Sequence, residues 1–124
     1  MKIIVDTHIL IWFTDDNPRL NSKHRDLISN GENVIYYSSI SLVELSIKIQ
    51  KQKLIMPDKY IEEFDNLLFT CLPFNKNHAK EFDNLPDYHS DPFDKIIISQ
   101  AINEKIPIIS YDSNFKHYKN LTLL

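Results

Sequence analysis

The chain has 124 residues, 43% of them hydrophobic and 25% charged, which is typical of a globular protein and unlike a disordered one. A net charge of -3 excludes a general basic field for nucleic acid, and a single glycine, Gly31, excludes phosphate-binding loops built on several glycines. The lone cysteine, Cys71, excludes an internal disulfide and fits a cytoplasmic location. We expect one domain over residues 1–124 and no membrane partner, because no apolar run approaches the roughly 18 residues of a membrane span.

In the first half of the chain, apolar runs of strand length alternate with stretches of helical spacing. The continuous apolar run at residues 3–5 predicts a strand that is buried on both faces. The further elements predicted here are a helix around residues 9–13 that Asn17 and Pro18 end, a helix at 20–30, a strand at 34–37 and a helix at 41–52.

The second half continues the alternation. Its predicted elements are a helix opened by Pro57 and Asp58, a strand at 71–74, helices at 76–85 and 91–105, a strand at 108–111 and an edge strand at 121–124. Strands that alternate with helices indicate an α/β fold with a central, mainly parallel sheet covered on both faces. Ligands of such folds gather beyond the carboxyl ends of the strands, so polar residues at those ends are the candidates for a site.

Acidic residues occupy several of these positions. Asp6 follows the first strand, Glu44 lies early in the helix after the second strand, Asp91 and Asp94 open a late helix, and Asp112 follows the last inner strand. Carboxylate oxygens suit Mg²⁺ or Mn²⁺. If these acids meet within ~5 Å, each pair repels by about 3 kcal/mol at an effective dielectric of 20, so the cluster needs a cation or a proton.

Each acid also has a purely structural interpretation. The alternatives are a helix cap for Asp6, a capping box for Ser41 and Glu44, an N-cap for Asp91, a favourable helix-dipole position for Asp94 and a turn for Asp112. The spacing of Asp94 favours a different role, because this residue shares a helical face with the apolar Ile97, Ile98 and Ala101. A cap needs no such orientation.

Four stretches, IIVDTHILIWF, SSISLVELSIK, LPDYHSDPFDKIIISQA and PIISYDSNF, resemble the successive motifs of PIN-domain ribonucleases. The resemblance is closest to VapC-like toxins of toxin–antitoxin pairs and runs from Lys2 to about Phe115. It implies a three-layer α/β/α fold, cleavage of RNA with Mg²⁺ or Mn²⁺, a small cognate antitoxin as partner, and a homodimer. The chain departs from the family pattern at Val43, where tryptophan is frequent, at Gln52, where glycine is usual, and at Ser99, where alanine is common.

Matched to the family motifs, the catalytic and metal-binding acids are Asp6, Glu44, Asp94 and Asp112, and Asp91 matches an additional aspartate beside the metal. RNA needs cationic guidance, for which we consider Lys48, Lys51 and Lys95. Thr7 and Ser110 could donate hydrogen bonds to RNA at the same edge of the sheet, or could equally be plain surface hydroxyls. The lysines are explained equally well as a solvated helix face. Trp12 and Phe13 are expected to be mostly core, with some apolar helix surface left for a dimer or an antitoxin.

Two other functions fit the sequence less well than the nuclease. A PIN-like binding module without turnover is disfavoured because all the family's acids are present. A phosphate-handling receiver domain needs an acid pair after the first strand and a lysine after a late strand, whereas this chain offers Asp6 alone and Asp112.

Overall fold

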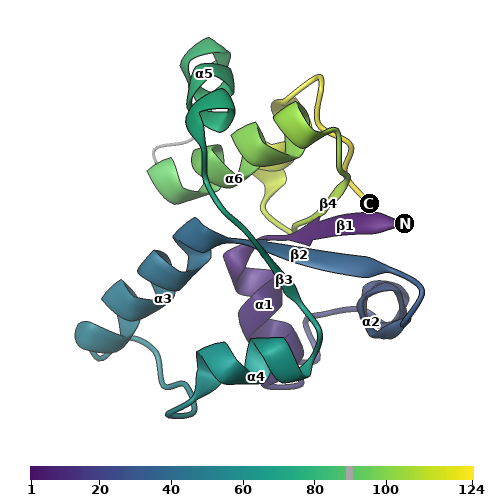
Figure 1. The fold of residues 1–124 in the computed structure, drawn as a ribbon, viewed down its shortest axis with the longest axis vertical. Coiled ribbons are helices and arrows are strands. Elements are labelled where there is room, and N and C mark those ends of the chain that lie inside the picture. The colour runs from purple at the N-terminus through teal and green to yellow at the C-terminus, as the bar shows by residue number, and fades with distance from the viewer. Residues whose placement is uncertain (89–90) are drawn as a thin grey trace.

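The computed structural model describes residues 1–88 and 91–124 (Figure 1). Residues 89 and 90, part of the LPDYHSDPFDKIIISQA motif, lie outside the described residues. The elements are β1 (Lys2–Val5), α1 (Thr7–Thr14), α2 (Ser22–Ser29), β2 (Val34–Ser38), α3 (Ser39–Gln50), α4 (Tyr60–Asn66), β3 (Thr70–Leu72), α5 (Lys76–Asn84), α6 (Pro92–Glu104), β4 (Ile108–Ile109) and the 3₁₀-helix η1 (Ser113–His117). None of these helices is long and apolar enough to cross a membrane.

The four strands form one parallel sheet in the order β3-β2-β1-β4. Figure 1 shows α5 and α6 on one face of this sheet and α1 and α4 on the other. The predicted α/β fold with a central parallel sheet between helical layers is therefore confirmed.

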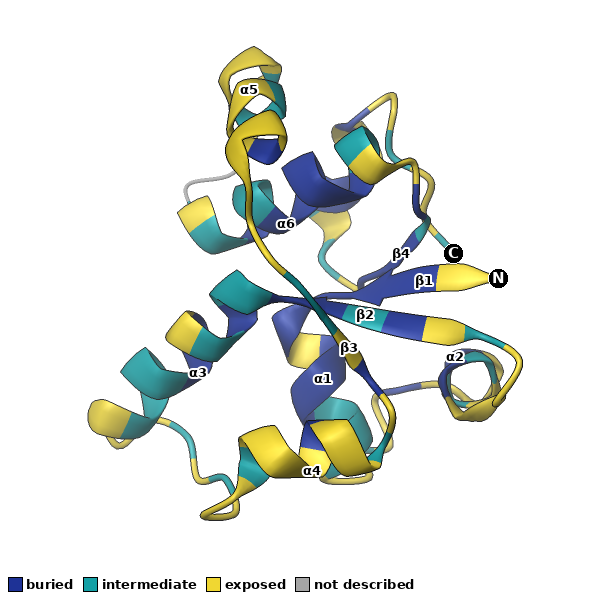
Figure 2. Cartoon of the chain, in the orientation of Figure 1, coloured by how far each residue is buried: buried dark blue, intermediate teal, exposed yellow. Residues whose placement is uncertain are grey.

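The alternation of side chains along β1 explains its continuous apolar run. Ile3 and Val5 pack in a cluster with residues of α1, α2, α3 and α4, whereas Ile4 packs in a second cluster with Ile97 of α6 and Phe115 of η1. All three β1 side chains are buried, as the dark strand in Figure 2 shows. A strand with a helical layer on each side has no polar face, so the three inner positions of β1 after the exposed Lys2 are all apolar.

Several element boundaries differ from the predictions for local reasons. The α3 helix begins at Ser39, two residues before the predicted start, because the Ser38 hydroxyl accepts a hydrogen bond from the Ile40 amide at 3.1 Å. The β3 strand ends before Pro73, which has no amide hydrogen to pair. The predicted edge strand at 121–124 is reduced to one parallel bridge, between Ile108 and Leu123.

The helix predicted from Pro57 begins only at Tyr60. The Pro57 carbonyl accepts a hydrogen bond from the Tyr60 amide at 3.1 Å, so a turn precedes the helix. The predicted strand at 108–111 pairs only over Ile108–Ile109, after which the chain leaves the sheet. That early exit determines where the residues after β4 lie.

Candidate active site

The carboxyl ends of β1 and β4 lie side by side, because these strands pair in parallel with Val5 opposite Ile109. From β1 the chain crosses to β2 on one side, while β4 lies on the other side of β1. Such a change of direction opens a crevice beyond the strand ends. Asp6 directly follows β1, and Ser110 and Asp112 follow β4, so these three polar residues meet at this point.

Asp6 is buried and caps α1, where its Oδ1 accepts a hydrogen bond from the Ile9 amide at 2.9 Å. Burial raises the pKa of Asp6, a hydrogen bond from the Ser110 hydroxyl lowers it, and the Glu44 carboxylate raises it. The predicted capping role is confirmed. The Asp6 carboxylate therefore accepts hydrogen bonds from both the Ile9 amide and the Ser110 hydroxyl.

Ser110 also connects Asp112 to Asp6, because it hydrogen-bonds to both residues. The Asp112 amide donates to Ser110 Oγ at 3.2 Å, and Asp112 Oδ1 accepts from the Asn114 amide at 2.8 Å to cap η1. Ser110 therefore contacts the backbone of one acid and the side chain of the other. Its hydroxyl is buried and positions these acids, a role different from the predicted contact with RNA.

Glu44 lies in the interior of α3, and the capping-box interpretation is wrong. The helix starts at Ser39 with Ser38 as its cap, so Ser41 is already inside the first turns. Glu44 is buried; its Oε2 lies 3.3 Å from the Lys48 ammonium, and its Oε1 has no hydrogen-bond partner. A buried carboxylate oxygen without a partner is costly and indicates a missing ligand or water.

Asp91 and Asp94 begin α6 in different ways. Asp91 is the N-cap and its Oδ1 accepts from the Phe93 amide at 2.9 Å, with Pro92 as the first helical residue. Asp94 is buried on the same face as Ile97 and Ile98, as its spacing predicted.

The electrostatics of Asp94 connect all five acids. Burial and, in decreasing order, the carboxylates of Asp91, Asp6, Glu44 and Asp112 together raise the pKa of Asp94 to about 8. Four acids from other positions in the sequence therefore act on one side chain. The charges of the five acids thus act on one another at Asp94, and their role in binding a metal stays a prediction.

The acids are near one another without forming a ready-made coordination shell. Among the described residues, no group of three or more acidic, histidine or cysteine side chains is placed to hold a metal ion. These side chains still suit a divalent cation, because carboxylate oxygens are hard ligands. One of the oxygens, Glu44 Oε1, is buried without a hydrogen-bond partner. The negative charges of the other four acids also act on Asp94, and a cation would offset this repulsion.

The predicted RNA contacts are placed less favourably. Thr7 is buried, and its hydroxyl shares a 2.8 Å hydrogen bond with Ser41, so it joins α1 to α3 and does not reach the surface. Lys48 pairs with Glu44, and the Lys95 ammonium lies 4.6 Å from the centre of the Phe82 ring. Lys51 is exposed at the end of α3.

An aromatic cavity beside the acids was not predicted from the sequence. It has a volume of about 230 Å³ and is lined by Asp6, His8, Trp12, Tyr111 and Asp112. Helical spacing predicts Trp12 as a core residue, and the run at residues 108–111 predicts Tyr111 as part of a strand. Two signals were available: His8 and Trp12 are one helical turn apart just after the first acid, and Tyr111 directly precedes Asp112.

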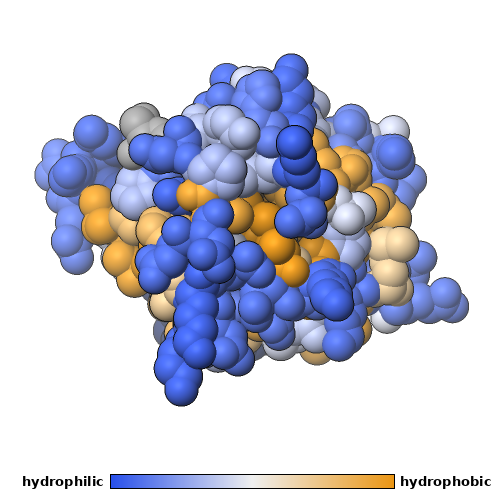
Figure 3. All heavy atoms as spheres, turned by 90° about the horizontal axis from the view of Figure 1, so that it is seen from above, coloured by the Kyte–Doolittle hydropathy of each residue, from blue (hydrophilic) through white to orange (hydrophobic). Residues whose placement is uncertain are grey.

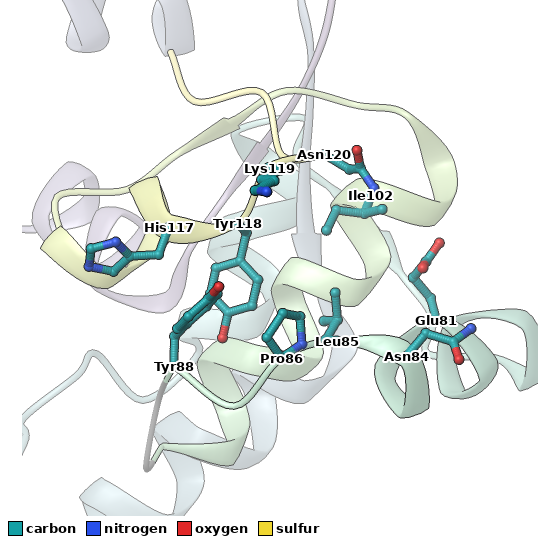
Figure 4. A pocket seen from close by; sticks show the side chains of 10 residues that line it. All are labelled: Glu81, Asn84, Leu85, Pro86, Tyr88, Ile102, His117, Tyr118, Lys119 and Asn120. Carbon is teal, nitrogen blue, oxygen red and sulfur yellow. The ribbon is translucent and has the colours of Figure 1, made fainter.

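A cavity of about 350 Å³ lies elsewhere, between the end of α5, α6 and the segment after η1. Figure 4 shows Tyr88, Tyr118 and His117 at one end and Glu81 and Asn84 at the other. None of the five clustered acids lines it. Its greater volume therefore does not make it the candidate active site.

The fold and the acids together define an α/β protein with an acidic site at the carboxyl edge of a parallel sheet. Within that class, the chain belongs to the PIN domain family, which matches residues 3–121. The comparison with curated proteins found no match.

Solved structures share the fold over the whole chain. A chain of VapBC2 from Rickettsia felis, bound to a promoter DNA fragment, has a TM-score of 0.75 and 22% identity, covering 100% of this chain and 98% of that one. A chain of DNA-bound VapBC from Salmonella typhimurium has a TM-score of 0.73 and 16% identity, covering 100% and 97%. FitAcB from Neisseria gonorrhoeae has a TM-score of 0.66 and 18% identity, covering 98% and 96%.

Proposed function

We propose that this protein is a metal-dependent endoribonuclease that hydrolyses RNA phosphodiester bonds and acts as the toxin of a toxin–antitoxin pair. The observation that carries the proposal is that Asp94 is buried where the charges of four other acids act on it, two of which, Asp6 and Asp112, follow β1 and β4. A fold needs no such concentration of negative charge, whereas phosphoryl chemistry with a divalent cation does. Membership of the PIN domain family supports the same activity.

Asp6, Asp94 and Asp112 would hold Mg²⁺ or Mn²⁺, with Glu44 joining through Oε1 and Asp91 beside them. When bound, a divalent cation supplies Lewis-acid activation of water and offsets the negative charge that develops on the attacked phosphate. Ser110 hydrogen-bonds to both Asp6 and Asp112 and so fixes their positions relative to each other. Lys48 offsets the charge at Glu44 Oε2, which leaves Oε1, buried without a hydrogen-bond partner, as the oxygen available to a cation.

A small antitoxin and a second copy of the chain are the proposed protein partners. The similar solved chains come from VapBC and FitAB assemblies, which supports the first of these. The surface also has apolar side chains for a partner to cover, since Ile55 is 97% exposed and Leu68 is 84% exposed. Figure 3, viewed from the side of α5, shows apolar side chains surrounded by hydrophilic ones on that face.

The test is cleavage of single-stranded RNA by the purified protein. We expect products with Mg²⁺ or Mn²⁺, none with a chelator, and at least a hundredfold loss for Asp94→Asn. Asp83→Asn is the matched control, because Asp83 is an exposed acid on α5 outside the cluster. RNA binding without metal-dependent cleavage would overturn the nuclease and favour a PIN-like binding module.

Toxicity is tested separately by expression without an antitoxin. Wild-type protein should arrest growth, and Asp6→Asn protein made to the same level should not. Equal tolerance of both proteins would contradict the toxin assignment while leaving the cleavage result intact.

A further inference from the structure

The aromatic cavity opens directly onto the acids of the candidate site. Asp6 and Asp112 are two of its five lining residues, with His8, Trp12 and Tyr111 as the others. Any group that fills this cavity therefore lies against the atoms proposed to act on the phosphate. A volume of about 230 Å³ is room for one planar heterocycle, and an extended peptide or RNA segment needs more.

Two accessible aromatic rings form the wall. The Trp12 and Tyr111 rings meet nearly edge to face, with centroids 5.4 Å apart, and the His8 ring lies 6.2 Å from that of Trp12. Tyr111 is 38% exposed, and Trp12 packs against a core cluster but is only partly buried, so both rings leave accessible surface at the cavity. Partly exposed aromatic rings are the surfaces on which proteins stack single-stranded bases.

The Tyr111 ring is held in place by its hydroxyl, which accepts a hydrogen bond from the Asn21 amide at 2.9 Å and lies 2.7 Å from His24 Nδ1. His24 Nε2 lies 3.1 Å from the Leu124 carbonyl oxygen. Since the carbonyl only accepts, Nε2 carries the hydrogen, and the tyrosine hydroxyl donates to Nδ1. The start of α2 and the end of the chain thus both fix one exposed ring, which reduces the entropy cost of stacking on it.

A cation lies next to the same wall. The Arg19 guanidinium is 5.9 Å from the centre of the Trp12 ring and is exposed. Arginine beside an aromatic platform is the pairing that single-strand binding surfaces use for phosphate and base together. It places a positive charge beside the aromatic cavity, in addition to that of Lys48 at Glu44.

We propose that the cavity binds one base of the RNA next to the scissile phosphate, by stacking against Trp12 and Tyr111 with Arg19 toward the backbone. This inference rests on the proposed function and adds to it the residues that position the substrate. It makes Trp12 and Tyr111 positioning residues for the cleavage reaction.

The chain provides its own probe, because Trp12 is the one tryptophan in the sequence. Wild-type protein in chelator is titrated with the four nucleoside 5′-monophosphates and with ribose 5-phosphate, and tryptophan fluorescence is followed, with free tryptophan amide correcting for absorption. We expect saturable quenching by at least one nucleotide and none by ribose 5-phosphate. Absence of quenching by all four nucleotides, or equal quenching by ribose 5-phosphate, would overturn the proposal.

Substitutions test whether the aromatic rings of the cavity are responsible for nucleotide binding. Tyr111→Ala should weaken nucleotide binding roughly tenfold, whereas Tyr111→Phe, which keeps the ring, should stay within about threefold of wild type. Phe74→Ala is the matched control, an aromatic that is 37% exposed and outside the cavity. Equal weakening by Phe74→Ala would contradict the assignment, and the wild-type titration decides alone if Tyr111→Ala does not fold.

The two proposals fail in different ways. Quenching without RNA cleavage would support the proposed base-binding cavity and contradict the proposed nuclease activity. RNA cleavage without quenching overturns the base site alone.

Discussion

The Lys48 ammonium lies 3.3 Å from Glu44 Oε2, one helical turn further along α3, while Glu44 Oε1 is buried without a hydrogen-bond partner. Glu44 also raises the pKa of both Asp6 and Asp94, so its charge acts on the acid cluster. One carboxylate thus has a cation on one side and other acids on the other. In the absence of metal, Lys48 is the counter-ion that makes burial of Glu44 tolerable.

Replacing Lys48 with methionine should lower the free energy of unfolding by about 1–2 kcal/mol, less than for a fully buried pair because the Lys48 side chain is 31% exposed. Addition of Mn²⁺ should recover part of the loss, since a ligand of the folded state stabilises it. Chemical denaturation with and without Mn²⁺ measures both effects. Lys51→Met, at the exposed end of the same helix, serves as the control and should be nearly neutral.

Without metal, the contribution of Asp94 to stability should fall as pH rises from about 4 to about 8. An aspartate without interactions has a pKa of 3.8, and in the folded protein the pKa of Asp94 is raised to about 8. Folding therefore favours the protonated form of Asp94. That stabilising contribution is complete below about pH 4 and is lost as pH rises through about 8. The thermal midpoint should fall by several degrees over this window.

Asp94→Asn should flatten that pH dependence, because asparagine carries no charge at any of these pH values. Saturating Mn²⁺ should also flatten it in the wild type, since a bound cation favours the ionised carboxylate. A wild-type profile that stays level in chelator would contradict the clustering of acids around Asp94.

The buried hydrogen bond between Thr7 and Ser41 should behave as a coupled pair. Thr7→Val or Ser41→Ala alone leaves one buried hydroxyl without its partner and should lower the unfolding free energy by about 1–3 kcal/mol. The double variant should lose less than the sum of the two single losses. Additive losses in a double-mutant cycle would show that the two hydroxyls do not depend on each other.

Gln52 should be replaceable by glycine with a gain in stability. It ends α3 in a left-handed conformation with φ of 59°, and its amide donates to the Ile49 carbonyl at 3.0 Å. A side chain costs roughly 1 kcal/mol in this conformation, which glycine adopts freely. Gln52→Gly should raise the thermal midpoint, whereas Gln50→Gly, inside the helix, should lower it. A loss for both would show that the glycine entropy cost dominates.

The fold was predictable where one local pattern determined the result. The apolar run at residues 3–5 gave β1, and Pro92 after Asp91 gave the start of α6. The end of β4 was not predictable, because the apolar run continues to Tyr111 while the sheet partner, β1, stops pairing after Val5. The length of an edge strand depends on its neighbour, which its own sequence does not describe.

The acids of the site were predictable because they sit at strand ends and helix starts, which sequence patterns locate. The partners of polar side chains were not. Thr7 was expected at the surface and is buried against Ser41, from a different helix. Trp12 fits the helical spacing of a core residue, and only the position of Tyr111, far away in sequence, makes it part of a cavity wall.

Asp6, Asp91 and Asp112 each begin a helix as well as belonging to the acid cluster, so folding and chemistry share the same side chains. Alanine at any of them removes a cap together with a charge, and the loss of activity then says nothing about the metal. Asparagine begins a helix about as well as aspartate and removes only the charge. For this protein, the choice between asparagine and alanine decides whether an inactive variant reports on catalysis or on folding.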